Sequence, residues 1–126
     1  MNMIYKTRHF NRWAGKASLS DDLLRRAVEE MTNGLIDADL GGGVFKKRVA
    51  LPGRGKSGSA RTLLATNRDD RWIFILGFEK NERANISDKE RDALRMLAKD
   101  LLGLTAEQLN KAINEGALLE VCYGKE

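Results

Sequence analysis

The spacing of apolar residues predicts a strand and two helices in the first third of the chain. Residues 4–7 read as a short strand, and Thr7 is placed to cap the helix that follows it. Ser20 is the predicted N-cap of the next helix, because apolar side chains follow at helical spacing: Leu23, Leu24, Ala27, Val28 and Met31. Asn33 and Gly34 are predicted to end that helix, since glycine suits a left-handed C-terminal position.

The middle of the chain changes to a strand pattern. Residues 44–51 alternate between an apolar side and a polar side that holds Lys46 and Arg48, which predicts a half-buried strand. Lys47 is the exception on the apolar side, and we expect it near a sheet edge with its ammonium group reaching solvent. A second strand is predicted at residues 61–66.

The next signals complete a meander. Residues 67–70 read as a hairpin turn, because they combine Asn and Asp side chains that bond to nearby backbone. Residues 72–78 form a continuous aromatic and branched run, so we expect a central strand that is covered on both faces.

Two further helices are predicted at the end of the chain. Each begins with a capping box, a Ser or Thr three residues before a Glu or Gln, at Ser87 and at Thr105. Gly103 and Gly116 are placed to end these helices, and residues 117–121 read as a closing edge strand.

This order of elements predicts an α+β fold. We expect a small antiparallel sheet, a three-strand meander plus edge strands, packed with N- and C-terminal helices. The length of 126 residues predicts a single domain over residues 1–126.

Positive charge is concentrated in one segment. The chain has 22 Lys and Arg residues against 18 Asp and Glu, a net charge of +4. Residues 41–68 hold no acidic residue but seven basic ones: Lys46, Lys47, Arg48, Arg54, Lys56, Arg61 and Arg68. We therefore expect that internal ion pairs are not the purpose of these cations, and that the glycine run 41–43 and the loop 53–58 let backbone surround a phosphate with them.

Other composition features narrow the function. No apolar run is long enough to span a bilayer and no signal peptide is visible, so we expect a cytoplasmic protein without membrane partners. One cysteine, Cys122, and one histidine, His9, cannot form a structural zinc site, and we expect no metal and no cofactor. We expect His9 to be a surface or packing residue.

Residues 50–57 match a relaxed P-loop pattern that ends in Gly-Lys-Ser. A P-loop delivers phosphates to a helix N-terminus, but residues 58–64 do not read as a helix. An ATPase or GTPase is therefore disfavoured.

Several of these segments together resemble a known family. The runs at residues 39–50, 53–58, 61–62 and 77–86 are similar to RelE-type toxins of bacterial type II toxin–antitoxin modules. Within the RelE/ParE superfamily, the chain resembles the subgroup that carries a Gly-Lys-Ser-Gly loop. The resemblance extends from Phe10 to Val121 and implies a RelE-like fold.

The resemblance also implies an activity. Such toxins are endoribonucleases that cut messenger RNA on the ribosome, where the substrate 2′-hydroxyl attacks the adjacent phosphodiester, and this cleavage stops translation. It implies a catalytic role for Arg61, Lys80 and Arg83, and RNA binding by another set of residues: Lys46, Arg48, Arg54, Lys56 and Ser57. Lys and Arg can stabilise a pentacovalent phosphorane without a metal.

Two other functions remain open. One is a non-enzymatic gyrase inhibitor like the ParE toxins, although a protein target would not require this many cations. The other is a basic RNA-binding module without catalysis, which the scarcity of aromatic residues in the basic segment disfavours.

The resemblance finally implies partners. A toxin of this kind is expected to act on the ribosome and mRNA and to be held by a cognate antitoxin. An acidic segment of the antitoxin could cover Lys46, Arg48 and Arg61, or one of its helices or strands could lie against the toxin. From its glycine content and its charges, the loop 53–58 is expected either to meet an RNA phosphate through Lys56 and Ser57 or to be a flexible connection between strands that makes no such contact.

Overall fold

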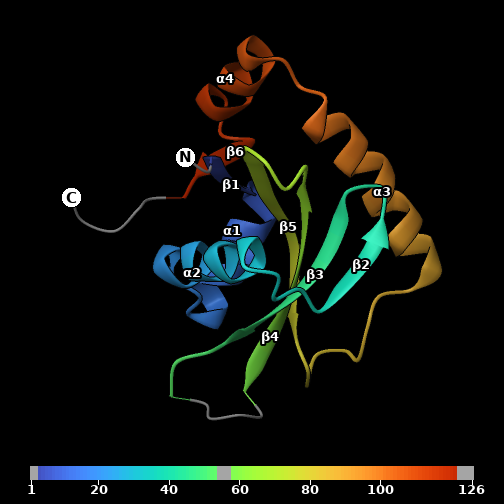
Figure 1. Ribbon diagram of the computed structural model, residues 1–126. Coiled ribbons are helices and arrows are strands. Elements are labelled where there is room, and N and C mark those ends of the chain that lie inside the picture. Colours follow the sequence, from blue (N-terminus) through green and yellow to red (C-terminus); the bar gives the residue numbers. More distant parts are fainter. Residues whose placement is uncertain (1–2, 54–57, 122–126) are drawn as a thin grey trace.

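The computed structural model describes residues 3–53 and 58–121 (Figure 1). These residues form a mixed sheet with helices on both faces, and the elements in chain order are β1 Met3–Thr7, α1 Arg8–Ala17, α2 Asp21–Thr32, β2 Ala38–Gly41, β3 Val44–Ala50, β4 Ser59–Thr66, β5 Arg71–Glu79, α3 Asp88–Leu102, α4 Ala106–Asn114 and β6 Leu118–Glu120. The α+β fold expected from the sequence is confirmed.

The sheet has the strand order β2-β3-β4-β5-β1-β6. The antiparallel meander β3-β4-β5 forms its middle, as predicted, and β5 is enclosed by β4 and β1. β1 pairs in parallel with β5 and antiparallel with β6. The sequence predicts an antiparallel sheet throughout, and the β1–β5 pair is the exception.

The helices begin where the sequence predicts. Each helix follows a residue whose hydroxyl oxygen accepts a hydrogen bond from the backbone amide three residues later: Thr7, Ser20, Ser87 and Thr105. These caps satisfy amides that have no partner inside the helix. Both predicted capping boxes are complete, because Glu90 and Gln108 bond back to the cap amides.

The sheet separates two apolar clusters. On one face, α1 and α2 pack against the sheet around side chains such as Phe10, Phe74 and Trp72. On the other face, α3 and α4 pack around Leu63, Ile73 and other residues (Figure 1). β5 is therefore covered on both faces, as its continuous apolar run predicts.

The strand β2 was not predicted. It pairs with β3, and the turn between them contains Gly42 and Gly43 with φ of 63° and 85°. The expectation that glycines 41–43 lie with the loop 53–58 around one phosphate is wrong. They are at the opposite end of β3 from that loop, where Gly43 packs so closely on Leu102 that a Cβ would lie 2.9 Å from its side chain.

The ammonium group of Lys47 does not reach solvent, and this part of the expectation is wrong. β3 is an interior strand, and the Lys47 residue is only 6% exposed. Its ammonium group pairs with Glu30 at 2.8 Å and donates to the carbonyl oxygen of Leu35 at 3.0 Å. Thus at least one cation of the basic segment serves an internal ion pair with α2.

The loop after β3 does not lead into a helix. β4 begins at Ser59 and pairs back along β3 as far as the Ala50–Ser59 register position. This arrangement confirms that the Gly-Lys-Ser pattern is not a P-loop, because no helix N-terminus follows it to receive phosphates.

Gly77 is the tightest glycine of the described fold. A Cβ on Gly77 would lie 2.3 Å from the Trp13 ring, which α1 packs against β5. We expect Gly77→Ala to lower the free energy of unfolding by about 1–3 kcal/mol through overpacking, as measured by urea denaturation.

Gly15→Ala is the matched control, since Gly15 lies in α1 and a Cβ added there would meet nothing within 4 Å. Alanine is the better helix former by about 1 kcal/mol, so this variant should be as stable as the parent or more stable. Equal stability of the two variants would contradict the packing of Trp13 on Gly77.

Candidate functional site

The alternation of β3 places two cations on the face that α3 covers. Phe45 and Val49 point into the cluster beneath α1 and α2, so Lys46 and Arg48 point to the other face. Arg61 of β4 is the direct register partner of Arg48. Like charges opposite each other destabilise an antiparallel strand pair. The pairing of Arg48 with Arg61 therefore lowers the stability of the β3–β4 pair.

These cations surround a cavity of about 140 Å³, which is lined by Asp37, Lys46, Arg48, Arg61 and Ala84. Lys46 and Arg61 are half-buried there, and Arg48 is exposed. The walls of this cavity are mostly polar. Charge-assisted hydrogen bonds from Lys and Arg are the contacts that a phosphate forms most strongly.

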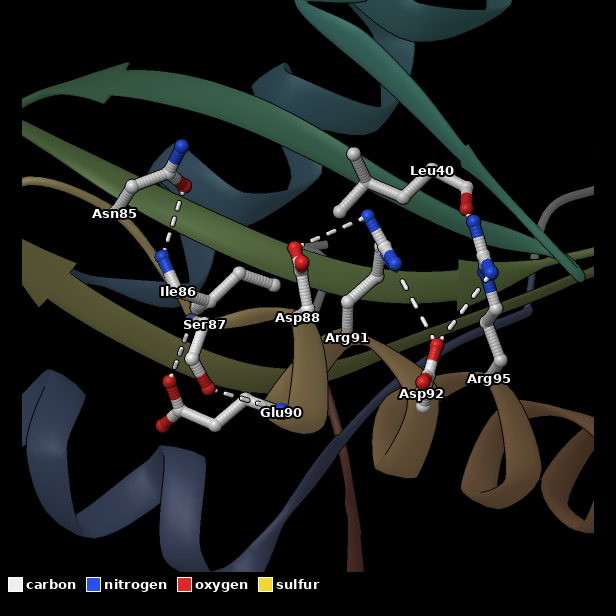
Figure 2. Close-up of polar contacts among 9 residues, drawn as sticks. All are labelled: Leu40, Asn85, Ile86, Ser87, Asp88, Glu90, Arg91, Asp92 and Arg95. Carbon is white, nitrogen blue, oxygen red and sulfur yellow. Dashed lines mark hydrogen bonds and ion pairs between the residues drawn. The ribbon is translucent and has the colours of Figure 1, made fainter.

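A second cavity of about 120 Å³ adjoins the first through Lys46. Its other walls come from Leu40 and the start of α3, which Figure 2 shows from Asn85 to Arg95. Arg91 in this wall pairs with Asp88 at 3.4 Å and with Asp92 at 3.7 Å. The first cavity therefore has the larger excess of cations, since three of them line it with one carboxylate and its arginines do not share the carboxylates that hold Arg91.

Asp37 is a site residue that the sequence analysis missed. Its carboxylate lies in the cation-lined cavity and accepts a hydrogen bond of 2.5 Å from the backbone amide of Arg48. Its own amide donates to the carbonyl oxygen of Lys46 at 3.2 Å. Reading the glycine run 41–43 as a hairpin turn would have placed Asp37 beside the basic strand.

Arg61 is partly anchored within its own strand. One guanidinium nitrogen donates to the hydroxyl oxygen of Ser59 at 3.2 Å and lies 3.5 Å from the Ser59 carbonyl oxygen. Ser59 is buried, so this contact fixes the direction in which Arg61 enters the cavity.

Arg83 lies next to the cavity and is firmly held. Its guanidinium stacks over the Phe78 ring at 5.4 Å, and Phe78 is the register partner of Arg61. Arg83 also pairs with Glu90 and donates to the Asn85 carbonyl oxygen at 3.2 Å.

Glu90 therefore serves two partners. It accepts the Arg83 hydrogen bond, and it also accepts the amide of Ser87 at 2.9 Å in the capping box (Figure 2). These contacts lower the pKa of Glu90 from 4.5 to about 2, the bond from Arg83 first and the backbone bond from Ser87 second.

Of the remaining predicted site residues, the structure describes only Lys80. Lys80 is exposed in the turn after β5 and contributes to neither cavity as the described residues form them. Arg54, Lys56 and Ser57 lie outside the described residues. Arg68, the last cation of the basic segment, stacks over Phe45 at 5.6 Å, beyond the other end of β3.

Two further features of the described chain bear on function. Its residues include no group of three or more His, Cys, Asp or Glu side chains that could hold a metal ion. Among the helices that the structure describes, none is both long and apolar enough to cross a membrane.

The fold and the site together define a small α+β protein with a cation-lined cavity on one face of its sheet. The family model of the RelE toxin of the RelE/RelB toxin–antitoxin system matches residues 2–121. No curated protein matches the chain significantly. The chain belongs to the RelE toxin family, as its motifs suggested, and this membership implies an antitoxin partner.

The lowered pKa of Glu90 predicts a pH effect on stability. A carboxyl group whose pKa is lower in the folded chain stabilises it above the unfolded pKa, and this stabilisation is lost as the pH falls toward the folded pKa. We expect Glu90→Gln to be less stable than the parent near neutral pH, with a difference that shrinks between pH 4.5 and about 2. Urea denaturation across this range measures it.

Glu107→Gln is the control, because Glu107 also lies in the first turn of a helix, α4. A helix-dipole effect alone would give both variants the same pH dependence. The same pH dependence for both variants would contradict the conclusion that Arg83 is the main cause of the lowered pKa of Glu90.

Proposed function

We propose that the protein is a metal-independent endoribonuclease that cleaves mRNA on the ribosome. The observation that carries this proposal is the cavity in which Lys46, Arg48 and Arg61 gather on one face of the sheet, beside Arg83. Membership in the RelE toxin family supports it. The ribosome and its message would be the partners, in the cytoplasm.

The cations suit the charge that develops during cleavage. When the 2′-hydroxyl attacks the adjacent phosphorus, negative charge builds on the phosphorane oxygens, and nearby fixed cations stabilise it. Arg61 would contact this phosphate, with Arg83 beside it, while Lys46 and Arg48 would grip it and its neighbour. Lys80, exposed outside the cavity, would serve a more distant phosphate.

The reaction also needs a proton acceptor and a proton donor. The carboxylate of Asp37 would accept the 2′-hydroxyl proton as the new O–P bond forms. The 5′-oxygen then leaves with a proton from a cation, and the Lys46 ammonium suits this step better than guanidinium, which keeps its protons. The products would be a cyclic phosphate and a 5′-hydroxyl end.

Arg61→Ala tests the proposal most directly. We expect cleavage of translated messages to fall by about 100-fold or more, since one stabilising donor of a developing oxyanion is worth that much. Growth arrest after expression in bacteria should be relieved. Thermal stability should stay equal or rise slightly, because the like-charge pair with Arg48 is removed.

Arg12→Ala is the matched control, an exposed cation of α1, the helix packed on the other face. Primer extension on messages from expressing cells maps the cuts. Growth arrest with intact messages and DNA-damage induction would show gyrase inhibition instead. RNA binding by the parent without any cleavage would leave only a binding module.

Asp37→Asn removes the proposed proton acceptor and leaves the cations of the cavity in place. Asparagine can still accept the Arg48 amide through its side-chain oxygen, so the fold should be retained. Cleavage is expected to fall about 100-fold, as for loss of a general base, while ribosome binding stays equal or tightens.

The control for this variant is Asp39→Asn, since Asp39 lies in β2, two residues after Asp37, and its carboxylate also accepts a hydrogen bond from a backbone amide, that of Gly41. Single-turnover cleavage of ribosome-bound message compares the two. Full activity of Asp37→Asn would remove Asp37 from the mechanism.

A further inference from the structure

A third cavity, of about 140 Å³, lies where α2 meets the end of β3. Three consecutive residues of β3 line it, and α2 provides walls from three of its residues: Arg48, Val49 and Ala50, then Leu23, Arg26 and Glu30. Side chains alternate between the two faces of a strand, so three consecutive residues border one cavity where it lies along the strand's edge. The third cavity is therefore at the edge of β3.

This edge is open because β2 is short. β2 is the outer neighbour of β3, and their pairing begins at Lys46 and runs away from Arg48. Next to that pairing, the Asp37 carboxylate accepts the backbone amide of Arg48. β2 does not extend to Val49 or Ala50, so a ligand can approach this edge beside α2, which packs on β3 (Figure 1).

The third cavity adjoins the cation-lined cavity. Arg48 lines both of them, and Lys46 joins the cation-lined cavity to the second cavity in the same way. The three cavities therefore follow one another along β3 and are joined at two of its cations. Proteins bind single-stranded nucleic acid in basic grooves that follow its backbone, which carries one phosphate per nucleotide. Adjoining cavities that share cations form such a groove.

Arg26 is the cation that α2 adds to this groove. It is exposed, and Glu30 follows it by four residues, the spacing at which ion pairs commonly form on a helix. Glu30 instead pairs with the buried Lys47 at 2.8 Å. Within the part of the chain that the structure describes, Arg26 forms no ion pair with a carboxylate. The inward pairing of Lys47 thus leaves Arg26 available to a ligand.

The charge balance of the third cavity favours an anion. Arg26 and Arg48 line it together with one carboxylate, that of Glu30, whose charge Lys47 offsets. Guanidinium groups bind phosphate oxygens with charge-assisted hydrogen bonds, often two at a time. A phosphodiester placed between the two arginines would meet a guanidinium on each side.

We propose that the third cavity binds the backbone phosphate of a message nucleotide that flanks the scissile phosphate, through Arg26 and Arg48. The proposal rests on the proposed function, which identifies the RNA as a message. The strand then crosses the edge of β3, from the cation-lined cavity on one face of the sheet to α2 on the other. Arg48, which borders both cavities, contacts both phosphates.

Arg26→Ala tests this subsite, with Arg25→Ala as its matched control. Both variants remove one cation from the same turn of α2. Arg25, however, already pairs with Asp22 at 3.5 Å and with Glu29 at 3.3 Å, and it is not among the described residues that line the cavity. The probe is bacterial ribosomes programmed with a short synthetic message whose A-site codon is made of deoxynucleotides. Without the 2′-hydroxyl this message cannot be cut, so the assay measures binding alone.

Arg26→Ala is expected to weaken binding by about tenfold, as the loss of a hydrogen bond to a charged group does. The slope of log K against log salt concentration should fall by about 0.7, the contribution of one single-strand phosphate. Arg25→Ala should bind within about twofold of the parent, because its cation is already paired on the helix surface. Both variants should keep the parent's melting temperature within a few degrees, since alanine favours a helix.

A methylphosphonate, which removes the charge of one phosphate, then identifies the contact. It is placed in turn at each phosphate of the A-site codon and of its neighbours. At one flanking position it should weaken binding of the parent by about tenfold and leave binding of Arg26→Ala unchanged, because the partner of that phosphate is already absent.

Equal affinities of the two arginine variants would overturn the subsite. So would weaker binding by Arg26→Ala that depends on no message phosphate, since ribosomal RNA would then be the ligand of Arg26. Cleavage of an ordinary message is measured separately, so the two proposals can fail independently. A parent that shows the expected dependence on one phosphate and cuts no message would refute the endoribonuclease and retain the subsite.

Discussion

The alternation of side chains along β3 is the constraint on which the site depends. Successive residues of a strand point to opposite faces, so three consecutive cations cannot act together. Lys46 and Arg48 face the cavity, while Lys47 is buried on the other side with Glu30. This ion pair lets α2 pack over a strand that carries charge on both of its faces.

The sequence predicts the elements well where the signal is local. Cap hydroxyls, glycine stops and apolar periodicity are contained in a few neighbouring residues, so the helices and the meander agree with prediction. β2 lacks such a signal, because its residues are partly exposed and become a strand only by pairing with β3. Asp37 and the partner of Lys47 were missed for the same reason, since both depend on contacts between segments distant in sequence.

The candidate site, too, could be predicted only where its residues lie on neighbouring strands of one hairpin. The concentration of charge points to Lys46, Arg48 and Arg61, because a regular hairpin brings them together. The concentration of charge cannot show that Lys80 lies outside the cavity, because the turn after β5 determines where Lys80 is placed. Nor can it show that Glu90 holds Arg83. The capping box at Ser87 is visible in the sequence, yet its second use, as the anchor of an arginine beside the cavity, appears only in three dimensions.

The pairing of β1 has a consequence for synthesis. Its two neighbours in the sheet are β5 and β6, which are made long after it, and β6 ends only at Glu120. Until those residues leave the ribosome, both edges of the first strand are open and the sheet cannot close. Such long-range pairing folds slowly, so the sheet is completed only after β6 has been made, and the nascent chain exposes strand edges until then.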